Sequence, residues 1–169
     1  MRDIKKMTQI TMLISISILF HILESMVYLP IPIPGFKLGL ANIVGLVALY
    51  SYGIKTMVQV NIFRVLLASL LRGALFGTAF WLSLGGVLCS MLASVLAYKK
   101  TPMSMYGVSV ASSVFHVIGQ MIVVSLLYQQ LLMGYLLPIL VLLSIPTGLC
   151  IAYIGKEVSK RLTPSLHVS

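Results

Sequence analysis

The chain has 169 residues, of which 59% are hydrophobic and only 9% are charged, and its mean hydropathy is +1.06. Roughly a quarter of an ordinary soluble chain is charged, so this composition excludes a soluble domain and predicts a single transmembrane domain over residues 1–169. A net charge of +9 would suggest nucleic-acid binding in a soluble protein. Here the basic residues lie mainly between apolar segments, where they set membrane topology. We therefore expect contact with the lipid bilayer and none with nucleic acid.

Apolar segments follow one another along almost the whole chain. A helix needs about 20 mostly apolar residues to cross a hydrocarbon core of roughly 30 Å. On this basis the sequence predicts spans at 8–28, 38–52, 54–71, 73–98, 104–128 and 131–154. The expected fold is all-α, a polytopic membrane protein of about six transmembrane helices. The second and third segments are short, so they form either two full spans or a tilted, re-entrant hairpin.

The basic residues predict the orientation of the chain. With the N-terminus in the cytoplasm, nine Lys and Arg residues fall inside and two outside, as the positive-inside rule requires. The inside group is Arg2, Lys5, Lys6, Lys55, Lys99, Lys100, Lys156, Lys160 and Arg161, and the outside group is Lys37 and Arg72. We expect a plasma-membrane protein with both termini in the cytoplasm. A four-span arrangement with a re-entrant hairpin would move only Lys55 to the outside.

The first external loop contains Leu-Pro-Ile-Pro-Ile-Pro-Gly-Phe-Lys over residues 29–37. Each proline fixes φ and removes a backbone donor, so this segment is expected to be extended and stiff. It is either a rigid connector or a lid over a site that opens to the outside.

Polar residues inside the spans are the candidates for a site, because they are costly in lipid and often mark function. The candidate solute-binding residues are His21, Glu24, Lys37, Asn42, Asn61, Arg64, His116 and Gln120. Either they make separate structural pairs, or several of them converge beneath the proline loop around a small solute. We expect Glu24 to lie within hydrogen-bonding reach of Arg64, Lys37, Arg72, His21 or Asn42.

The acidic residues argue against catalysis of prenyl transfer, which uses clustered aspartates to hold Mg²⁺ against the leaving diphosphate. The only aspartate is Asp3, in the N-terminal tail. The sequence also lacks a Gly-rich phosphate loop with its lysine. We predict no enzymatic activity, no cofactor and no metal site, and any energy for transport must come from a partner.

Residues 34–43, Pro-Gly-Phe-Lys-Leu-Gly-Leu-Ala-Asn-Ile, together with Glu24 and the Asn61-x-x-Arg64 pair, carry a family resemblance. The chain resembles the Gx transporter family, whose members are often labelled heptaprenyl diphosphate synthase component I. Its size and layout also resemble the S components of energy-coupling factor transporters, six-helix subunits that bind a solute under an external loop.

This resemblance implies a substrate-binding subunit for a small vitamin-like or isoprenoid- or quinone-related solute, driven by a coupling membrane subunit and ATPases. S components present small residues on the first helix to that subunit, and Thr11 and Ser15 are the nearest match here. The alternative is a non-catalytic membrane partner or scaffold for a polyprenyl diphosphate synthase or an extracytoplasmic electron-transfer flavoprotein.

Overall fold

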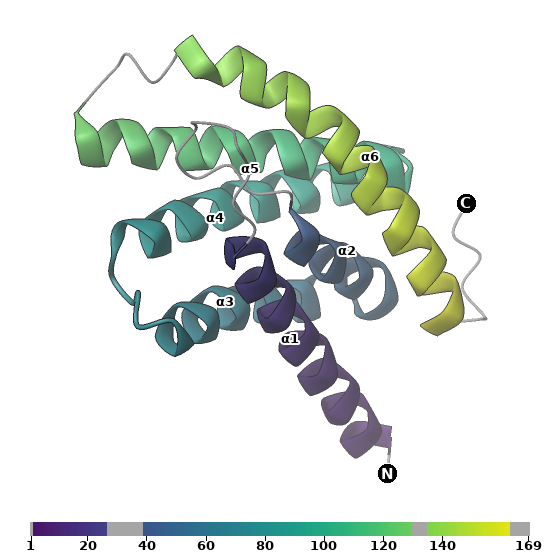
Figure 1. Ribbon diagram of the computed structural model, residues 1–169. Coiled ribbons are helices and arrows are strands. Elements are labelled where there is room, and N and C mark those ends of the chain that lie inside the picture. Colours follow the sequence, from purple (N-terminus) through teal and green to yellow (C-terminus); the bar gives the residue numbers. More distant parts are fainter. Residues whose placement is uncertain (1, 27–38, 130–134, 163–169) are drawn as a thin grey trace.

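The computed structural model describes residues 2–26, 39–129 and 135–162, which form six α-helices and no β-strand (Figure 1). The helices are α1 (Arg2–Met26), α2 (Leu40–Tyr52), α3 (Ile54–Leu71), α4 (Thr78–Lys100), α5 (Met105–Tyr128) and α6 (Leu137–Leu162). Within these ranges, five helices are long and apolar enough to cross a membrane. The predicted class, an all-α polytopic membrane protein, is confirmed.

The ends of several helices differ from the predicted spans for local reasons. The fourth helix begins at Thr78 rather than near residue 73, because the preceding chain turns at Gly73 and Phe76, both with φ of 62°. At that turn α3 ends in a Schellman motif, in which Gly73 N–H donates to Leu70 O and Ala74 N–H donates to Ser69 O. The proline-rich loop lies outside the described residues.

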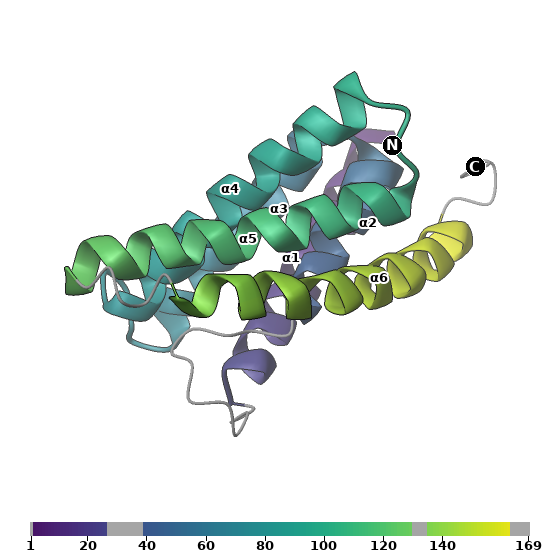
Figure 2. The ribbon, with the colours of Figure 1, turned by 90° about the horizontal axis from the view of Figure 1, so that it is seen from above.

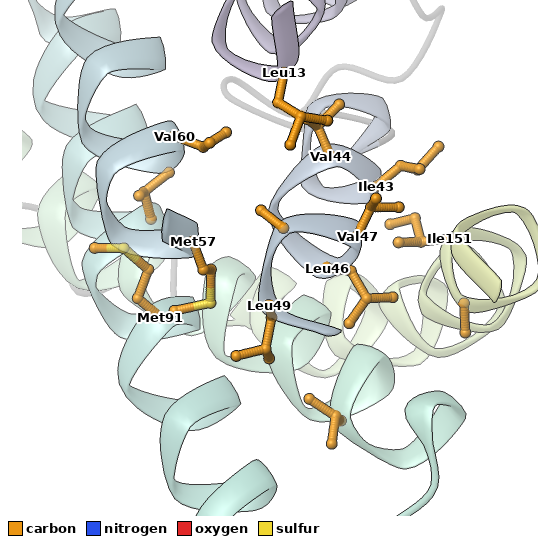
Figure 3. Close-up of a cluster of buried hydrophobic side chains, with 14 of the residues drawn as sticks. Leu13, Ile43, Val44, Leu46, Val47, Leu49, Met57, Val60, Met91 and Ile151 are labelled. Carbon is orange, nitrogen blue, oxygen red and sulfur yellow. The ribbon is translucent and has the colours of Figure 1, made fainter. Parts of the chain in front are cut away.

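The short helix α2 occupies the centre of the bundle. Its side chains from Ile43 to Leu49 are buried, and it packs against α1, α3 and α6. Figure 3 shows these side chains extending toward Leu13 of α1, Met57 of α3 and Ile151 of α6. The apolar core is therefore organised around α2, and the longer helices shield it from lipid.

With 13 residues, α2 is about 20 Å long and does not cross a hydrocarbon core of roughly 30 Å on its own. The following helix α3 has 18 residues and is long enough. The two are joined through Gly53, whose φ of 90° suits a glycine. Gly53 N–H donates to Leu49 O, and Gly53 O accepts from Met57 N–H. The pair is therefore a tight helical hairpin with one short, protein-enclosed arm.

The most extensively packed pair of helices is α4 and α5, which run side by side in both views (Figures 1 and 2). Their backbones meet at Gly85 and Gly119, where a Cβ added to Gly119 would lie 2.5 Å from Gly85 O and 2.8 Å from Cys89 Cβ. Small residues allow such close approach in membranes, where packing must replace the hydrophobic effect between helices.

One end of the bundle gathers most of the described basic residues. The rings of Tyr50 in α2 and Tyr98 in α4 lie 5.3 Å apart, and Lys156 Nζ in α6 lies 5.6 Å from the ring centroid of Tyr106 in α5. These contacts place the C-terminal ends of α2, α4 and α6 beside the start of α5. Since α3 starts at the same end, its far end at Arg72 lies opposite.

The glycine contact between α4 and α5 predicts a position-specific effect of a single methyl group. Gly119→Ala should lower the melting temperature of the detergent-solubilised protein, because overpacking against a backbone costs about 1–3 kcal/mol. The control is Gly107→Ala in the same helix, where the nearest atoms belong to the flexible Met103 side chain at 3.2 Å or more. Equal melting temperatures for the two variants would contradict the proposed close packing.

Candidate functional site

The carboxylate of Glu24 lies at the N-terminal end of α2. Glu24 is in the last turn of α1 and is 6% exposed, and its Oε1 accepts a hydrogen bond from the backbone N–H of Gly39, the residue that precedes α2. Gly39 has a φ of 81°, which favours glycine at this position. A carboxylate at a helix N-terminus is stabilised by the unpaired N–H groups and the helix dipole. Glu24 therefore links α1 to the start of α2.

Arg64 brings a buried positive charge to the same place. It lies in α3 and is only 2% exposed, and its Nη2 donates to Asn42 Oδ1 in the first turn of α2 at 3.2 Å. The opposite charges of Arg64 and Glu24 attract each other. Among the described residues, Nε and Nη1 of Arg64 have no hydrogen-bond partner. The guanidinium thus keeps donors that the described part of the chain does not use.

A small cavity joins these groups to two histidines and a serine. Its lining comes from α1 to α5 and consists of His21, Glu24, Gly39, Ala41, Asn42, Arg64, Ser83, Val87 and His116. The free space is about 10 Å³, which is room for about one water molecule. The polar groups are therefore closed around one another in this conformation, and we call them the charged cavity.

A second polar cavity lies on the other side of Asn42, which lines both. Its polar residues are Asn42, Asn61, Ser90, Ser94, Ser109, Ser112 and Ser113. Asn61 packs so closely on α2 that a Cβ on Gly45 would lie 2.8 Å from Asn61 Oδ1. This serine-lined cavity also has about 10 Å³ of free space. The polar residues that line this second cavity are uncharged, so the two cavities together form a polar interior with one charged end and one neutral end.

The structure brings together His21, Glu24, Asn42, Arg64 and His116, which line the charged cavity. It places Asn61 in the serine-lined cavity, and Gln120 lies beside His116, where both side chains approach Gly86. Lys37 lies outside the described residues. Arg72 is exposed at the end of α3, so of the expected arginine partners of Glu24 only Arg64 shares its buried site.

Thr11 and Ser15, the expected docking residues, are both exposed on α1. Their hydroxyls donate within the helix, from Thr11 Oγ1 to Met7 O and from Ser15 Oγ to Thr11 O, each at 3.0 Å. Their polar atoms are thus satisfied on a surface that faces away from the bundle. They are separate from the charged cavity.

Several groups that contribute to the site are not among the residues predicted from the sequence. The backbone N–H of Gly39 has no side-chain signature, and Ser83 is a single serine in an apolar helix. The serine-lined cavity did carry a signal, since Ser90 and Ser94 in α4 and Ser109 and Ser113 in α5 share the four-residue spacing of one helical face. Two such faces on neighbouring helices predict a polar seam between them.

An apolar groove of about 510 Å³ opens between α1, α2 and α6 and is lined by residues such as Leu13, Phe20, Val47 and Ile154. It is much larger than the two polar cavities. Binding sites combine apolar walls with a few placed polar groups that fix orientation, and this groove is almost wholly apolar. Since lipid can fill such a groove, the charged cavity is the better candidate for a specific site.

The fold and the buried polar cluster define a polytopic helical membrane protein with ionised residues enclosed between its helices. The chain belongs to the family described as heptaprenyl diphosphate synthase component I, whose model matches residues 13–158. That range contains both polar cavities. Searches of curated proteins and of solved structures give no match.

The charge pair of the site predicts a coupled loss of stability. Glu24→Gln and Arg64→Gln should each lower the free energy of unfolding in detergent, because each leaves the opposite charge buried without compensation. The double variant should lose less than the sum, with a coupling energy of about 1–3 kcal/mol.

The control is Glu157→Gln, at an exposed glutamate that contacts Lys160 and Arg161 on the surface of α6. Exposed pairs contribute about 0–1 kcal/mol, so this variant should unfold close to the wild-type protein. Strict additivity of the Glu24 and Arg64 effects would show that the two charges do not interact.

Proposed function

We propose that this protein is the substrate-binding membrane subunit of an uptake transporter, and that it takes its solute into the polar interior formed by the two cavities. The observation that supports this most is the convergence of Glu24, Arg64, His21 and His116 inside membrane-spanning helices. Ionisable residues enclosed between such helices are expensive and usually mark a substrate or ion pathway. Residues that served packing alone could be replaced by apolar side chains of similar volume.

The arrangement of the two cavities supports a small polar solute. A charged end at Arg64 and a neutral end among serines would hold opposite ends of one molecule, with Asn42 between them. Each cavity holds only about one water molecule in the conformation described. Binding therefore requires the helices to separate, and the solute stabilises an open form that is sparsely populated without it. The solute is vitamin-like or related to isoprenoids and quinones, as the resemblance to S components implies.

The orientation proposed from the sequence places the charged cavity toward the outside. Lys99, Lys100, Lys156 and Lys160 lie at the ends of α4 and α6, which the tyrosine and lysine contacts bring to one end of the bundle. By the positive-inside rule this end is cytoplasmic. Glu24 and Arg64 then lie in the external half of the protein, where a solute arriving from outside would first be met.

The energy for uptake would come from a separate coupling membrane subunit and its ATPases. The exposed face of α1 is the proposed contact, because the small side chains at Thr11 and Ser15 allow another helix to approach closely. This face lies apart from the charged cavity. The two roles can therefore be separated by mutation.

A second candidate function follows from the family description, which names a component of heptaprenyl diphosphate synthase. In this version the protein is the non-catalytic membrane partner of a soluble synthase. The exposed Lys99–Lys100 pair and the Lys160–Arg161 pair would offer a basic docking surface for an acidic partner. This candidate gives no reason for a charge pair enclosed between the helices, so we place it second.

The transport proposal predicts a bound solute. Protein purified from its native membrane in mild detergent should release a small polar molecule on denaturation, detectable by mass spectrometry at near one equivalent. The amount should fall strongly in Asn42→Leu, which removes the group shared by both cavities, and stay unchanged in Gln59→Leu at an exposed position of α3. Finding no such molecule in repeated preparations would contradict the proposal.

The two functions predict different protein partners. Under the transport proposal, purification from the native membrane yields a second polytopic membrane protein with ATPases, and Thr11→Leu/Ser15→Leu weakens their recovery. Under the second candidate, a soluble prenyl-diphosphate synthase is recovered instead, and Lys160→Glu/Arg161→Glu releases it. Recovery of the synthase alone, sensitive only to the charge reversal, would favour the second candidate over the first.

A further inference from the structure

Arg64 has more hydrogen-bond donors than the described protein uses. A guanidinium carries five N–H donors in a planar fork and accepts none. Nη2 is used by Asn42 Oδ1, whereas Nε and Nη1 have no hydrogen-bond partner among the described residues. Arg64 is 2% exposed, so these donors are not served by bulk water.

The cost of this arrangement indicates that the donors are kept for a ligand. A buried donor without a partner loses its hydration without compensation, and the penalty is larger for a charged group. A structural arginine in lipid would be expected to place its fork on backbone carbonyls or on both oxygens of a carboxylate. Here the nearby carboxylate oxygen Glu24 Oε1 is engaged by the N–H of Gly39. Glu24 is thus bound at the start of α2, whereas Nε and Nη1 of Arg64, beside the charged cavity, have no hydrogen-bond partner among the described residues.

The chemistry of the open donors selects the ligand class. A planar guanidinium fork matches the oxygens of a carboxylate or a phosphate, which accept two parallel hydrogen bonds. The charges of Arg64 and Glu24 offset each other, so an added anion must be held by hydrogen bonds from several donors. His21 from α1, His116 from α5, Asn42 from α2 and Ser83 from α4 line the same cavity and carry side-chain groups of the kind that can donate to an anion.

We infer that the solute carries a carboxylate or a phosphate group and that this group binds Nε and Nη1 of Arg64. The inference rests on the proposed solute-binding function and specifies the class of solute. The remainder of the molecule extends past Asn42 toward the serine-lined cavity, where hydroxyl groups can contact an uncharged polar body.

The test compares three proteins that differ at arginine positions of one helix. Arg64→Lys keeps the positive charge but loses the planar fork, and Arg72→Gln changes an exposed arginine at the end of the same helix. The molecule released by each protein is identified by mass spectrometry. Thermal unfolding is then measured with sodium phosphate and with sodium acetate, against sodium chloride at equal ionic strength.

The inference predicts that the released molecule is an organic anion. Arg64→Lys should weaken its binding by about 30-fold or more, as expected for the loss of a buried charge-assisted contact, and Arg72→Gln should bind as wild type does. Stabilisation by phosphate alone or by acetate alone would identify the group, and neither stabilisation should survive in Arg64→Lys. If Arg64→Lys does not fold, Glu24→Gln/Arg64→Gln replaces it, because that variant leaves no buried charge uncompensated.

Two results would overturn the inference in different ways. A neutral or cationic solute, or an anion retained equally by Arg64→Lys, would refute the ligand class and leave the binding function standing. If no solute is released by the wild-type protein and neither anion stabilises it, the proposed function fails and the inference fails with it.

Discussion

The structure depends on how one buried charge pair is accommodated in a bundle that is otherwise almost wholly apolar. Ionised groups in such surroundings must be compensated by opposite charge and by hydrogen bonds. Glu24 at the end of α1 accepts from Gly39 at the start of α2, and Arg64 of α3 donates to Asn42 in the first turn of α2. Three helices are thereby joined at one point, and the residue before the short central helix is held by a side chain from another helix.

The short length of α2 connects the buried charge pair to the proposed function. A helix of 13 residues is too short to cross a hydrocarbon core on its own, and its N-terminal N–H groups need partners wherever protein encloses them. This requirement gathers polar groups around the start of α2, where a solute in the charged cavity would contact them. The buried side chains from Ile43 to Leu49 pack α2 against its neighbours. The close contact of Gly85 with Gly119 holds α4 against α5, and these two helices supply Ser83 and His116 to the site. The site is therefore built from the same contacts that order the fold.

Much of this architecture could be predicted from hydropathy, because long apolar runs leave few alternatives to helices in lipid. The convergence of His21, Glu24, Asn42, Arg64 and His116 could only be suspected, since residue spacing gives the face of each helix but not which faces meet. The hydrogen bond from Gly39 N–H to Glu24 could not be predicted, because a backbone group carries no side-chain signal. The start of α4 lies later than predicted for a similar reason. Gly73 and Phe76 adopt positive φ, but the apolar sequence around them is typical of a continuous helix.

The central claim is that the open donors of Arg64 receive the solute. It is tested most directly by an experimental structure of the protein purified with its native solute and resolved well enough to show the ligand between the helices. The account predicts ligand density within hydrogen-bonding distance of Nε or Nη1 of Arg64, with the charged cavity opened relative to the form described here. Ligand density confined to the apolar groove between α1, α2 and α6, with Arg64 still enclosed as before, would contradict it.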